Sequence, residues 1–318
     1  MSLKYPNKRK RVGYWKTYDA SEINNYRKVC GLILLMVQEL GNPFVKKDSR
    51  GRKPKLNRDY YVIICVFMVY FDKPLREMEG LLPLLFEEKL DHSTIDWWFK
   101  NFDEKYVHKA VKLLHNKIKK MFSDGEYVAD STKITTTRYY EMIHKGETTI
   151  ELRCLKLHLI IIYFASAGIL SIESMFMSHG DAHDSPIFLN ELIPTSEFDA
   201  GKRIHADKAY FAIENIRECK KKGLRVNIVP KDNAEHGLTI ITAKKEYDNE
   251  ARKQNRGLIE GLFGGLTTDN ELKTRYIRDD CRKIHGALLG LAHEIRTYLR
   301  VLCIKAQTLI QTIFRQPL

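Results

Sequence analysis

The hydrophobic pattern of the chain changes at Asp124-Gly125, and this change limits the possible folds more than any other feature. Before it, from about residue 59 to 122, apolar residues recur at helical spacing. After it, apolar segments rich in Ile, Val, Tyr and Thr are typical of strands. Three strands in succession, and then strands that alternate with helices, predict a mixed α/β sheet covered by helices. The predicted strands are 126–136, 154–165, 169–178, 203–207 and 225–230.

The region before the change is predicted to be entirely helical. One helix is expected near residues 23–40, and short helices separated by tight breaks follow from residue 59. One of these starts at Ser93, where Ser93 and Asp96 resemble a capping box. Short helices beside a basic arm favour a helix-turn-helix that binds DNA, although a plain helical packing domain fits the same pattern. Together with one helix near 244–266 and another near 284–304, the predicted regions are 1–58, 59–122, 123–281 and 282–318.

The charge of the chain indicates a polyanionic partner. The formal net charge is +13, and residues 1–58 hold fifteen Lys and Arg against four Asp and Glu. This arm contains a run at 8–11 and a second at 50–55, which includes Arg52 and Lys53. A charge run alone is equally consistent with a solvated tail, but the second run is our candidate for phosphate contacts with DNA.

The remaining composition narrows the class of protein. Six cysteines are scattered singly, so neither a zinc site nor a disulfide framework is predicted, and a reducing cytoplasm fits best. The first residues contain no apolar signal segment, and the longest apolar stretches are shorter than the roughly 20 residues of a membrane span. We expect a soluble cytoplasmic protein that associates with the nucleoid.

Three carboxylates lie where a metal-dependent nuclease needs them. Asp130 follows the apolar start of the first predicted strand, Asp207 ends the fourth, and Glu260 lies in a helical pattern after the last strand. Acidic groups drawn from distant segments repel one another unless they share divalent cations, and Mg²⁺ prefers carboxylate oxygen. Two such ions would support in-line phosphoryl transfer. The sequence therefore predicts that all three residues are catalytic metal ligands.

Each carboxylate also has a structural interpretation. Asp130 could cap a turn, Asp207 could form a surface ion pair with Lys208, and Glu260 could pair with Arg256 one helical turn earlier. The joint placement of the three favours the catalytic interpretation, because three independent coincidences would otherwise be needed.

Neighbouring polar residues have two interpretations each. His205 shares a strand face with Asp207 and is either a satisfied core histidine, which we favour, or an additional ligand. His183 and Asp184 are predicted to cap a helix that starts at Ser185. Lys208 and Lys133 are phosphate partners or surface charges.

These motifs resemble those of a DDE-class insertion-sequence transposase, in the group whose last acidic residue lies in a Y-x2-R-x3-E-x6-K signature. The matches, which span roughly residues 45 to 305, are Gly51 to Pro54, Ala129 to Thr132, Gly180 to Ser185, His205 to Tyr210 and Arg256 to Glu260. Lys253 stands at the signature Tyr and Thr267 at the signature Lys. These two departures from the signature are expected to affect the fine positioning of the DNA end.

The resemblance implies a ribonuclease H-like catalytic domain at 123–281, preceded by an all-α DNA-binding region. The predicted order of elements is also of the ribonuclease H type, in which the first and fourth strands lie side by side. By analogy, Asp130, Asp207 and Glu260 bind two Mg²⁺ ions, with Mn²⁺ as a substitute. Arg256 would hold the transposon end, and Lys253 would contact phosphate.

The predicted function is DNA transposition, by cleavage at the ends of a mobile element and joining of the ends to target DNA. Bringing two ends together suggests a homodimer in the DNA complex. A ribonuclease H-like nuclease without strand transfer and a domesticated, non-catalytic DNA-binding protein remain the alternatives.

Overall fold

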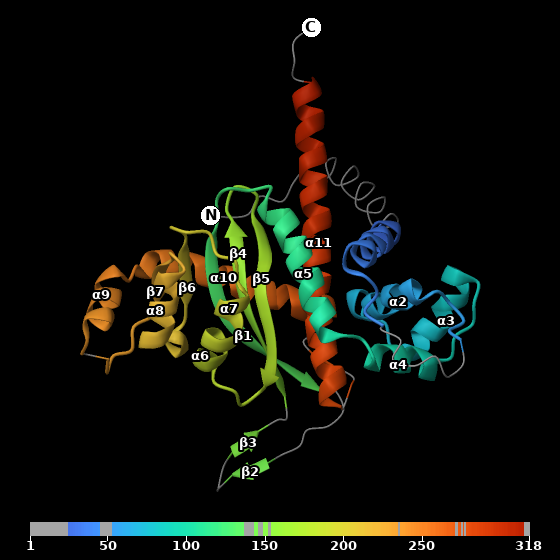
Figure 1. Cartoon of the computed structure of the whole chain (residues 1–318), viewed down its shortest axis with the longest axis horizontal. Helices are drawn as coiled ribbons and strands as arrows, with labels where there is room; N and C mark the ends of the chain where they lie inside the picture. The colour runs from blue at the N-terminus through green and yellow to red at the C-terminus, as the bar shows by residue number, and fades with distance from the viewer. Residues whose placement is uncertain are drawn as a thin grey trace, which may run out of the picture.

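The structure is a computed structural model that describes residues 25–44, 53–136, 143–145, 149–151, 154–234, 236–270, 273–274, 276 and 278–314. It is a mixed α/β protein in which a mixed sheet is flanked by helices and stands beside a helical region (Figure 1). Arg52, one of the predicted phosphate contacts, lies outside the described residues. Within the described ranges, no helix combines the length and the apolar character that a membrane crossing requires.

The helical region forms where the sequence predicts it. Residues 25–40 are helical, and Val29 and Ile33 in this helix are buried. The predicted break before Pro74 is confirmed, because Pro74 is the N-cap of the next helix. The predicted cap at Ser93 is wrong: Asp91 is the N-cap, and its carboxylate accepts a hydrogen bond from the Ser93 amide at 2.8 Å. The helices that follow residue 57 are α2 (Arg58–Tyr70), α3 (Leu75–Phe86), α4 (His92–Lys100) and α5 (Glu104–Lys119).

The sheet has the strand order β5-β4-β1-β6-β7, with β8 pairing with the end of β1. β4 runs antiparallel to both β1 and β5, whereas β6 is parallel to both β1 and β7. All five predicted strands are present, and the short strands β2, β3 and β8 were not predicted. The strands are β1 (Glu126–Thr136), β2 (Ile143–Lys145), β3 (Thr149–Glu151), β4 (Leu155–Phe164), β5 (Ile169–His179), β6 (Arg203–Ala206), β7 (Arg225–Ile228) and β8 (Lys273–Thr274).

The helices of the α/β region differ from expectation at one place. The predicted single helix over 244–266 is wrong, since the chain turns at Tyr247 and Asp248 and starts a new helix there. The Asp248 carboxylate caps that helix by accepting from the Ala251 amide at 3.0 Å. These elements are α6 (Asp184–Ile187), η1 (Phe188–Leu192), α7 (Ile193–Thr195), η2 (Lys208–Tyr210), α8 (Ile213–Lys221), α9 (Leu238–Glu246), α10 (Asn249–Asn270) and α11 (Asp279–Phe314).

The two faces of the sheet contribute to different cores. Along β1, Val128 packs in one apolar cluster with residues of α10 and α11, whereas Tyr127 and Ala129 pack in another with residues of η1 and α8. Side chains alternate between the faces of a strand, so Asp130 points to the Val128 face. His205 is the register partner of Val128, so Asp207 shares that face as well. Both aspartates therefore lie on the side of the sheet that α10 covers.

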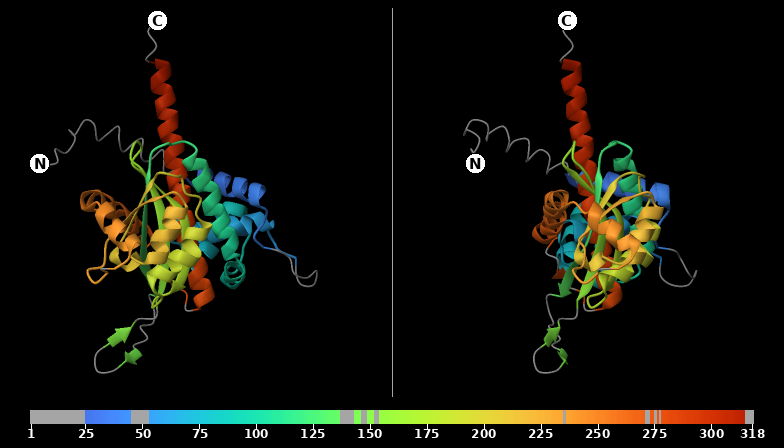
Figure 2. Two further views of the ribbon diagram at one scale, coloured as in Figure 1. Left: turned by 60° about the vertical axis from the view of Figure 1, so that its left-hand side comes forward. Right: turned by 90° about the vertical axis from the view of Figure 1, so that its left-hand side faces the viewer.

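The long helix α11 connects the sheet to the helical region. It packs on β5 and β4 as well as on α5 and α2, and its C-terminal part extends past the body of the protein (Figures 1 and 2). A Cβ at Gly286 would lie 2.6 Å from the Met177 side chain, and one at Gly290 would lie 2.7 Å from Met175. Glycine at these positions lets α11 approach β5 closely. The helix crosses the boundary predicted at 281/282 without a break.

Candidate active site

Asp130 and Asp207 lie at equivalent positions of neighbouring parallel strands. Ala129 on β1 is the register partner of Ala206 on β6, and each aspartate is the next residue of its chain segment. Neighbouring strands lie about 4.8 Å apart. Both side chains are partly exposed, so they are accessible to solvent and to a ligand. The structure thus places two predicted site residues together at the end of the β1–β6 pair.

Glu260 is carried by α10, the helix that packs against β1 and β6. Its neighbour Ile259 is buried in the core, whereas the Glu260 side chain is exposed. Among the described residues, Asp130, Asp207 and Glu260 are not a group whose oxygens all lie within 4.8 Å of one another. The helix brings Glu260 to the correct side of the sheet, but the three carboxylates do not form a closed cluster. Mutual repulsion of three negative charges opposes such closure.

A cation from the protein already contacts one of the carboxylates. Arg252 on α10 donates a hydrogen bond to an Asp207 carboxylate oxygen at 2.6 Å. The guanidinium side chain is 19% exposed and the aspartate 42% exposed, so the pair is only partly shielded from water. This contact ties the second turn of α10 to the end of β6.

A third aspartate, Asp184, lies at the same end of the sheet. The Oδ1 atom of Asp184 accepts hydrogen bonds from the Ser131 hydroxyl at 2.8 Å and from Lys156 Nζ at 3.1 Å, and it lies 3.4 Å from His158 Nδ1. The prediction that His183 and Asp184 cap α6 is wrong, because His183 is the N-cap position and makes no side-chain capping bond. The Asp184 carboxylate points instead toward β1 and β4, on the face of the sheet that carries Ser131.

Two titratable side chains near these aspartates stay neutral. Burial raises the pKa of the Tyr210 hydroxyl well above its ordinary value, and the charges of Asp184, Asp130 and Asp207 raise it further. Burial also lowers the pKa of His158 to about 4, against the opposing charge of Asp184. At neutral pH the Tyr210 hydroxyl therefore keeps its proton, and His158 carries no charge.

His205 is the satisfied core histidine that we favoured from the sequence. It is 2% exposed, its Nε2 atom lies 2.8 Å from a Glu126 carboxylate oxygen, and its Nδ1 atom lies 3.0 Å from the Asn227 side-chain amide. Burial lowers the pKa of His205, although Glu126 opposes that shift. Both ring nitrogens are used in these contacts, so neither is available as a metal ligand.

The predicted DNA contacts lie on several parts of the surface. Lys208 is exposed beside Asp207 and pairs with Asp232, and Lys253 is exposed on α10 and pairs with Glu250 at 3.1 Å. Lys133 on β1 and Lys53 in the second basic run are exposed as well. Arg256 lies on α10, but its side chain and all of Arg52 are outside what the structure describes.

The donor set fits a hard divalent cation. Asp130, Asp207 and Glu260 offer only carboxylate oxygens, which Mg²⁺ and Mn²⁺ accept, and their partial exposure leaves room for water and phosphate. A different group, formed by Glu79, Asp91 and His92 in the helical region, brings its ligand atoms within 4.8 Å. That group is part of a helix cap, because Asp91 caps α4 and Glu79 accepts from the His92 amide at 3.3 Å.

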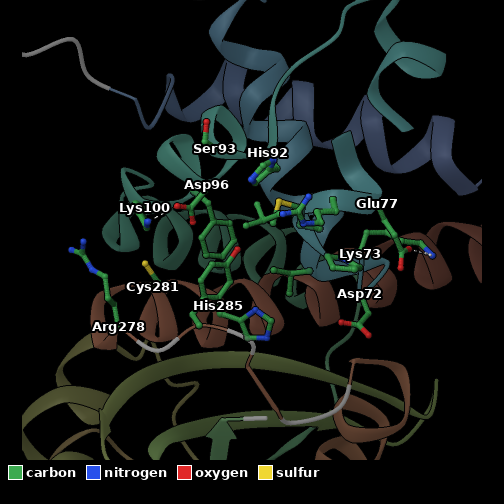
Figure 3. A pocket seen from close by; sticks show the side chains of 17 residues that line it. Asp72, Lys73, Glu77, His92, Ser93, Asp96, Lys100, Arg278, Cys281 and His285 are labelled. Atoms are coloured by element: carbon green, nitrogen blue, oxygen red, sulfur yellow. Dashed lines mark hydrogen bonds and ion pairs between the residues drawn. The ribbon is translucent and has the colours of Figure 1, made fainter. Parts of the chain in front are cut away.

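A pocket of about 740 Å³ lies elsewhere, between the helical region and the start of α11 (Figure 3). Side chains of both charge signs line it. Among them, Lys73 forms an ion pair with Glu77, and Lys100 forms one with Asp96. None of the residues predicted for the active site lines this pocket. It is therefore separate from the carboxylates at the end of β1 and β6.

The sequence interpretation missed Arg252 and gave Asp184 and Tyr210 no role at the site. For Arg252 a signal was present, since Arg252 and Glu260 are separated by eight residues and lie on the same side of a helix. Both Asp184 and Tyr210 lie inside motifs that were singled out, but only the fold shows that Asp184 bonds Ser131 and that Tyr210 is buried near three aspartates.

Comparison with known proteins adds little. No family model matches the chain, and no curated protein matches it. One solved structure that matches is the crystal structure of a pre-cleavage Mos1 transpososome, with 10% identity over 80% of this chain and 81% of that chain and a TM-score of 0.20. A TM-score this low establishes neither a shared fold nor a shared activity. Membership of a transposase family therefore stays a prediction.

Proposed function

We propose that this chain is a metal-dependent DNA transposase with a ribonuclease H-like catalytic domain. One observation carries the proposal: Asp130 and Asp207 directly follow Ala129 and Ala206, which are register partners on the parallel strands β1 and β6, and Glu260 lies on α10, which packs against the same two strands. The strand order β5-β4-β1-β6-β7 agrees with the ribonuclease H layout that the sequence predicts. The transposase motifs and the net charge of +13 support DNA as the substrate.

Asp130, Asp207 and Glu260 would hold two Mg²⁺ ions. Bound ions would polarise the scissile phosphodiester and lower the pKa of water. Arg252 already orients the Asp207 carboxylate. A metal ion that binds Asp207 would therefore compete with Arg252 for the carboxylate oxygens. Tyr210 is buried near the aspartates and keeps its proton.

The reaction would have two in-line displacements at phosphorus. In the first, a water oxygen attacks the phosphorus at the element end, the bond to the 3′ oxygen breaks, and that oxygen takes a proton. In the second, the released 3′ hydroxyl attacks a phosphorus of the target, and the 3′ oxygen of the target leaves. Exposed Lys208, Lys253 and Lys133 would neutralise DNA phosphates around the site. Two element ends would require two sites, so we propose a homodimer on DNA.

A non-catalytic DNA-binding protein is the second candidate. Two observations favour it: the three carboxylates do not close within 4.8 Å, and Lys253 and Thr267 replace the Tyr and Lys of the family signature. A ribonuclease H-like nuclease without strand transfer would use the same carboxylates as the transposase and would differ only in the second step.

Cleavage of DNA with and without Mg²⁺ tests the proposal. A supercoiled plasmid that carries the DNA flanking the gene is incubated with the wild type, Asp130→Asn and Glu260→Gln. We expect Mg²⁺-dependent nicking that falls by at least about 100-fold in both variants, since each removes a charged metal ligand. Joining of pre-cut ends to a second plasmid then separates the transposase from a simple nuclease.

The structure offers matched controls for these variants. Glu250 is a second exposed glutamate of α10, and Asp232 is an exposed aspartate that pairs with Lys208. Glu250→Gln and Asp232→Asn should keep the wild-type cleavage rate. A wild type that binds DNA but never cleaves it would favour the non-catalytic alternative, and equal losses in the controls would contradict the assignment of the site.

A further inference from the structure

A group of polar side chains joins α10 to three strands of the sheet, five residues before Glu260. We call Glu126, His205, Asn227 and Asn255 the α10 docking network. Glu126 comes from β1, His205 from β6, Asn227 from β7 and Asn255 from α10 itself. In Figure 1, α10 crosses the sheet beside these strands. Each candidate metal ligand is thus close in the chain to one member of the network: Asp130 shares β1 with Glu126, Asp207 follows the strand of His205, and Glu260 shares α10 with Asn255.

The centre of the network is His205, whose hydrogen bonds fix its tautomer. The Asn227 amide nitrogen lies 3.0 Å from Nδ1 and is a donor, so Nδ1 accepts. Nε2 then carries the proton and donates to a Glu126 carboxylate oxygen at 2.8 Å. The ring is 2% exposed, so these two bonds hold the strands β1, β6 and β7 at one relative position.

Asn227 also holds the first turn of α10. Its side-chain oxygen accepts from the Asp248 amide at 2.8 Å, and its amide nitrogen donates to the Asp248 carbonyl at 2.9 Å. Asp248 in turn caps α10 through the Ala251 amide. Two hydrogen bonds between the Asn227 side chain and the Asp248 backbone therefore attach the start of the helix to β7.

Asn255 holds the second turn. Its amide nitrogen donates to a Glu126 carboxylate oxygen at 3.0 Å and to the Ala251 carbonyl at 2.9 Å, and the residue is 8% exposed. Arg252, three residues earlier on the same helix face, contacts Asp207. From Asn255 the helix rises about 7.5 Å to Glu260. The network thus fixes α10 near the point where Glu260 emerges.

The apolar face of α10 does not fix the position of the helix along the sheet. Ile259, Leu262 and Phe263 are buried against the core, and they hold the helix on the sheet. Burial of apolar surface is non-directional, so it tolerates a small slide or rotation of the helix. Hydrogen bonds depend steeply on distance and angle, so the docking network resists the same movement.

We infer that the α10 docking network is a positioning device, which sets where Glu260 stands relative to Asp130 and Asp207. The inference rests on the proposed function, because it concerns the geometry of that site. Glu126, His205 and Asn255 act through α10 and the strands and do not touch the reacting atoms. They are positioning residues, in the way that groups behind metal ligands orient those ligands.

Hydrogen exchange of the full chain tests the docking without any need for activity. Asn255→Ala removes the bond between α10 and β1, whereas Asn249→Ala changes an exposed asparagine of the same helix. We expect amides of residues 252–262 to exchange about tenfold faster in Asn255→Ala than in the wild type. Amides of α5 and all amides in Asn249→Ala should keep their wild-type rates.

Cleavage kinetics of the same variants test the positioning. We expect kcat of Asn255→Ala to fall about 10- to 100-fold with KM nearly unchanged, because a shift near 1 Å in a catalytic group has this effect. A role limited to stability would leave kcat of the folded protein unchanged.

A pair of substitutions at Glu126 provides a second, independent test. Glu126→Met removes both acceptor bonds, whereas Glu126→Gln keeps an oxygen that can accept from His205 and Asn255. We expect kcat to fall in the first variant and to recover to within about threefold of the wild type in the second.

The outcomes separate the inference from the proposed function. Unchanged exchange along α10 in both Asn255→Ala and Glu126→Met overturns the inference whether or not the wild type cleaves DNA. Faster exchange with unchanged kcat in an active enzyme overturns it as well. A wild type that never cleaves contradicts the proposed function, and the exchange data then decide by themselves whether the network positions α10.

Discussion

Two buried histidines each contact a carboxylate on a strand, and the two contacts belong to networks of different chemistry. His115 on α5 lies 2.7 Å from Glu173 on β5, and His205 on β6 lies 2.8 Å from Glu126 on β1. We call Glu173 with its partners Lys112, Lys119, His115 and Ser171 the Glu173 network. It lies at the β5 edge of the sheet, whereas the α10 docking network lies beside the candidate active site.

The Glu173 network is charged. Glu173 is 1% exposed and lies 2.6 Å from Lys112 Nζ and 3.5 Å from Lys119 Nζ. Burial alone would raise the pKa of Glu173, but the hydrogen bond and charge of His115 and the charge of Lys112 lower it to about 2. This carboxylate is thus ionised throughout the physiological range and locks α5 onto β5.

The α10 docking network uses neutral partners instead. Its amides come from Asn227 and Asn255, and its carboxylate, Glu126, is 34% exposed in its side chain. Additional fixed cations beside Asp130 and Asp207 would compete with a divalent metal for the same oxygens. In the Glu173 network, charged partners hold α5 on the sheet far from the site, whereas near the site α10 is held by the amides of Asn227 and Asn255 together with the Arg252–Asp207 ion pair.

The largest effect is expected from Glu173→Gln. The substitution leaves Lys112 and Lys119 without their buried counter-charge, and breaking a buried pair costs about 3 to 5 kcal/mol. Urea denaturation should show this loss in the free energy of unfolding, whereas Glu126→Gln should lose less than about 1 kcal/mol. Equal losses in the two variants would erase the distinction between the networks.

The second effect is a dependence of stability on pH. Burial raises the pKa of Glu294, which accepts from the Ile172 amide and the Ser171 hydroxyl, to about 8. An acid whose pKa is raised on folding contributes stability below its unfolded value, near 4.5, and loses it as the pH rises through about 8. Thermal unfolding should therefore show a fall on the order of 2 to 4 kcal/mol between about pH 5 and pH 8.

Glu294→Gln is the control for that dependence. It removes the ionisable group and keeps an oxygen for the Ile172 amide, so the fall in stability over this pH range should largely disappear. A variant with the same pH dependence as the wild type would show that another group titrates.

Asn255→Ala is expected to have a smaller effect on stability. It removes two partly buried hydrogen bonds, to Glu126 and to the Ala251 carbonyl, and each contributes about 1 kcal/mol. The comparison predicts opposite profiles: Asn255→Ala lowers kcat with little loss of stability, and Glu173→Gln lowers stability while the folded fraction retains its kcat. Rates normalised to folded protein, measured at a temperature where both variants are folded, check this contrast.

The smallest effect concerns the salt dependence of DNA binding when one exposed lysine is removed beside the candidate site or beside the Glu173 network. Lys208 is exposed beside Asp207, and Lys109 is exposed on α5, the helix that covers the Glu173 network. Lys208→Met should reduce the slope of log affinity against log salt by about 1, the value for one lost phosphate contact. Lys109→Met should leave the slope unchanged. Equal slopes of log affinity against log salt for the two variants would contradict a DNA phosphate contact at Lys208.

The sequence predicts much of the fold because its periodicity is clear. The strands containing Asp130 and Asp207 are bounded by turn residues and carry alternating or continuous apolar patterns, so their positions follow from the sequence. The boundary between α9 and α10 was missed, although Asp248 caps α10 locally through the Ala251 amide, because this boundary is also attached to β7 by the bonds of Asp248 to Asn227, which is 21 residues away. Such long-range contacts override local propensity.

The site was predictable only in part, for the same reason. Asp130, Asp207 and Glu260 could be selected because motifs surround them. Their partners Arg252 and Asn255 could not, because these residues act across segments whose contact depends on the register of β1 with β6 and on the position of α10.

The most direct test of the account is the anomalous scattering of Mn²⁺ in crystals of the protein soaked with that ion. We predict a peak bound by carboxylate oxygens of both Asp130 and Asp207 at about 2.1 to 2.2 Å, with Glu260 moved into contact with the same site. Crystals in which Asp207 remains on Arg252 and Mn²⁺ binds only at Glu79, Asp91 and His92 would contradict the account.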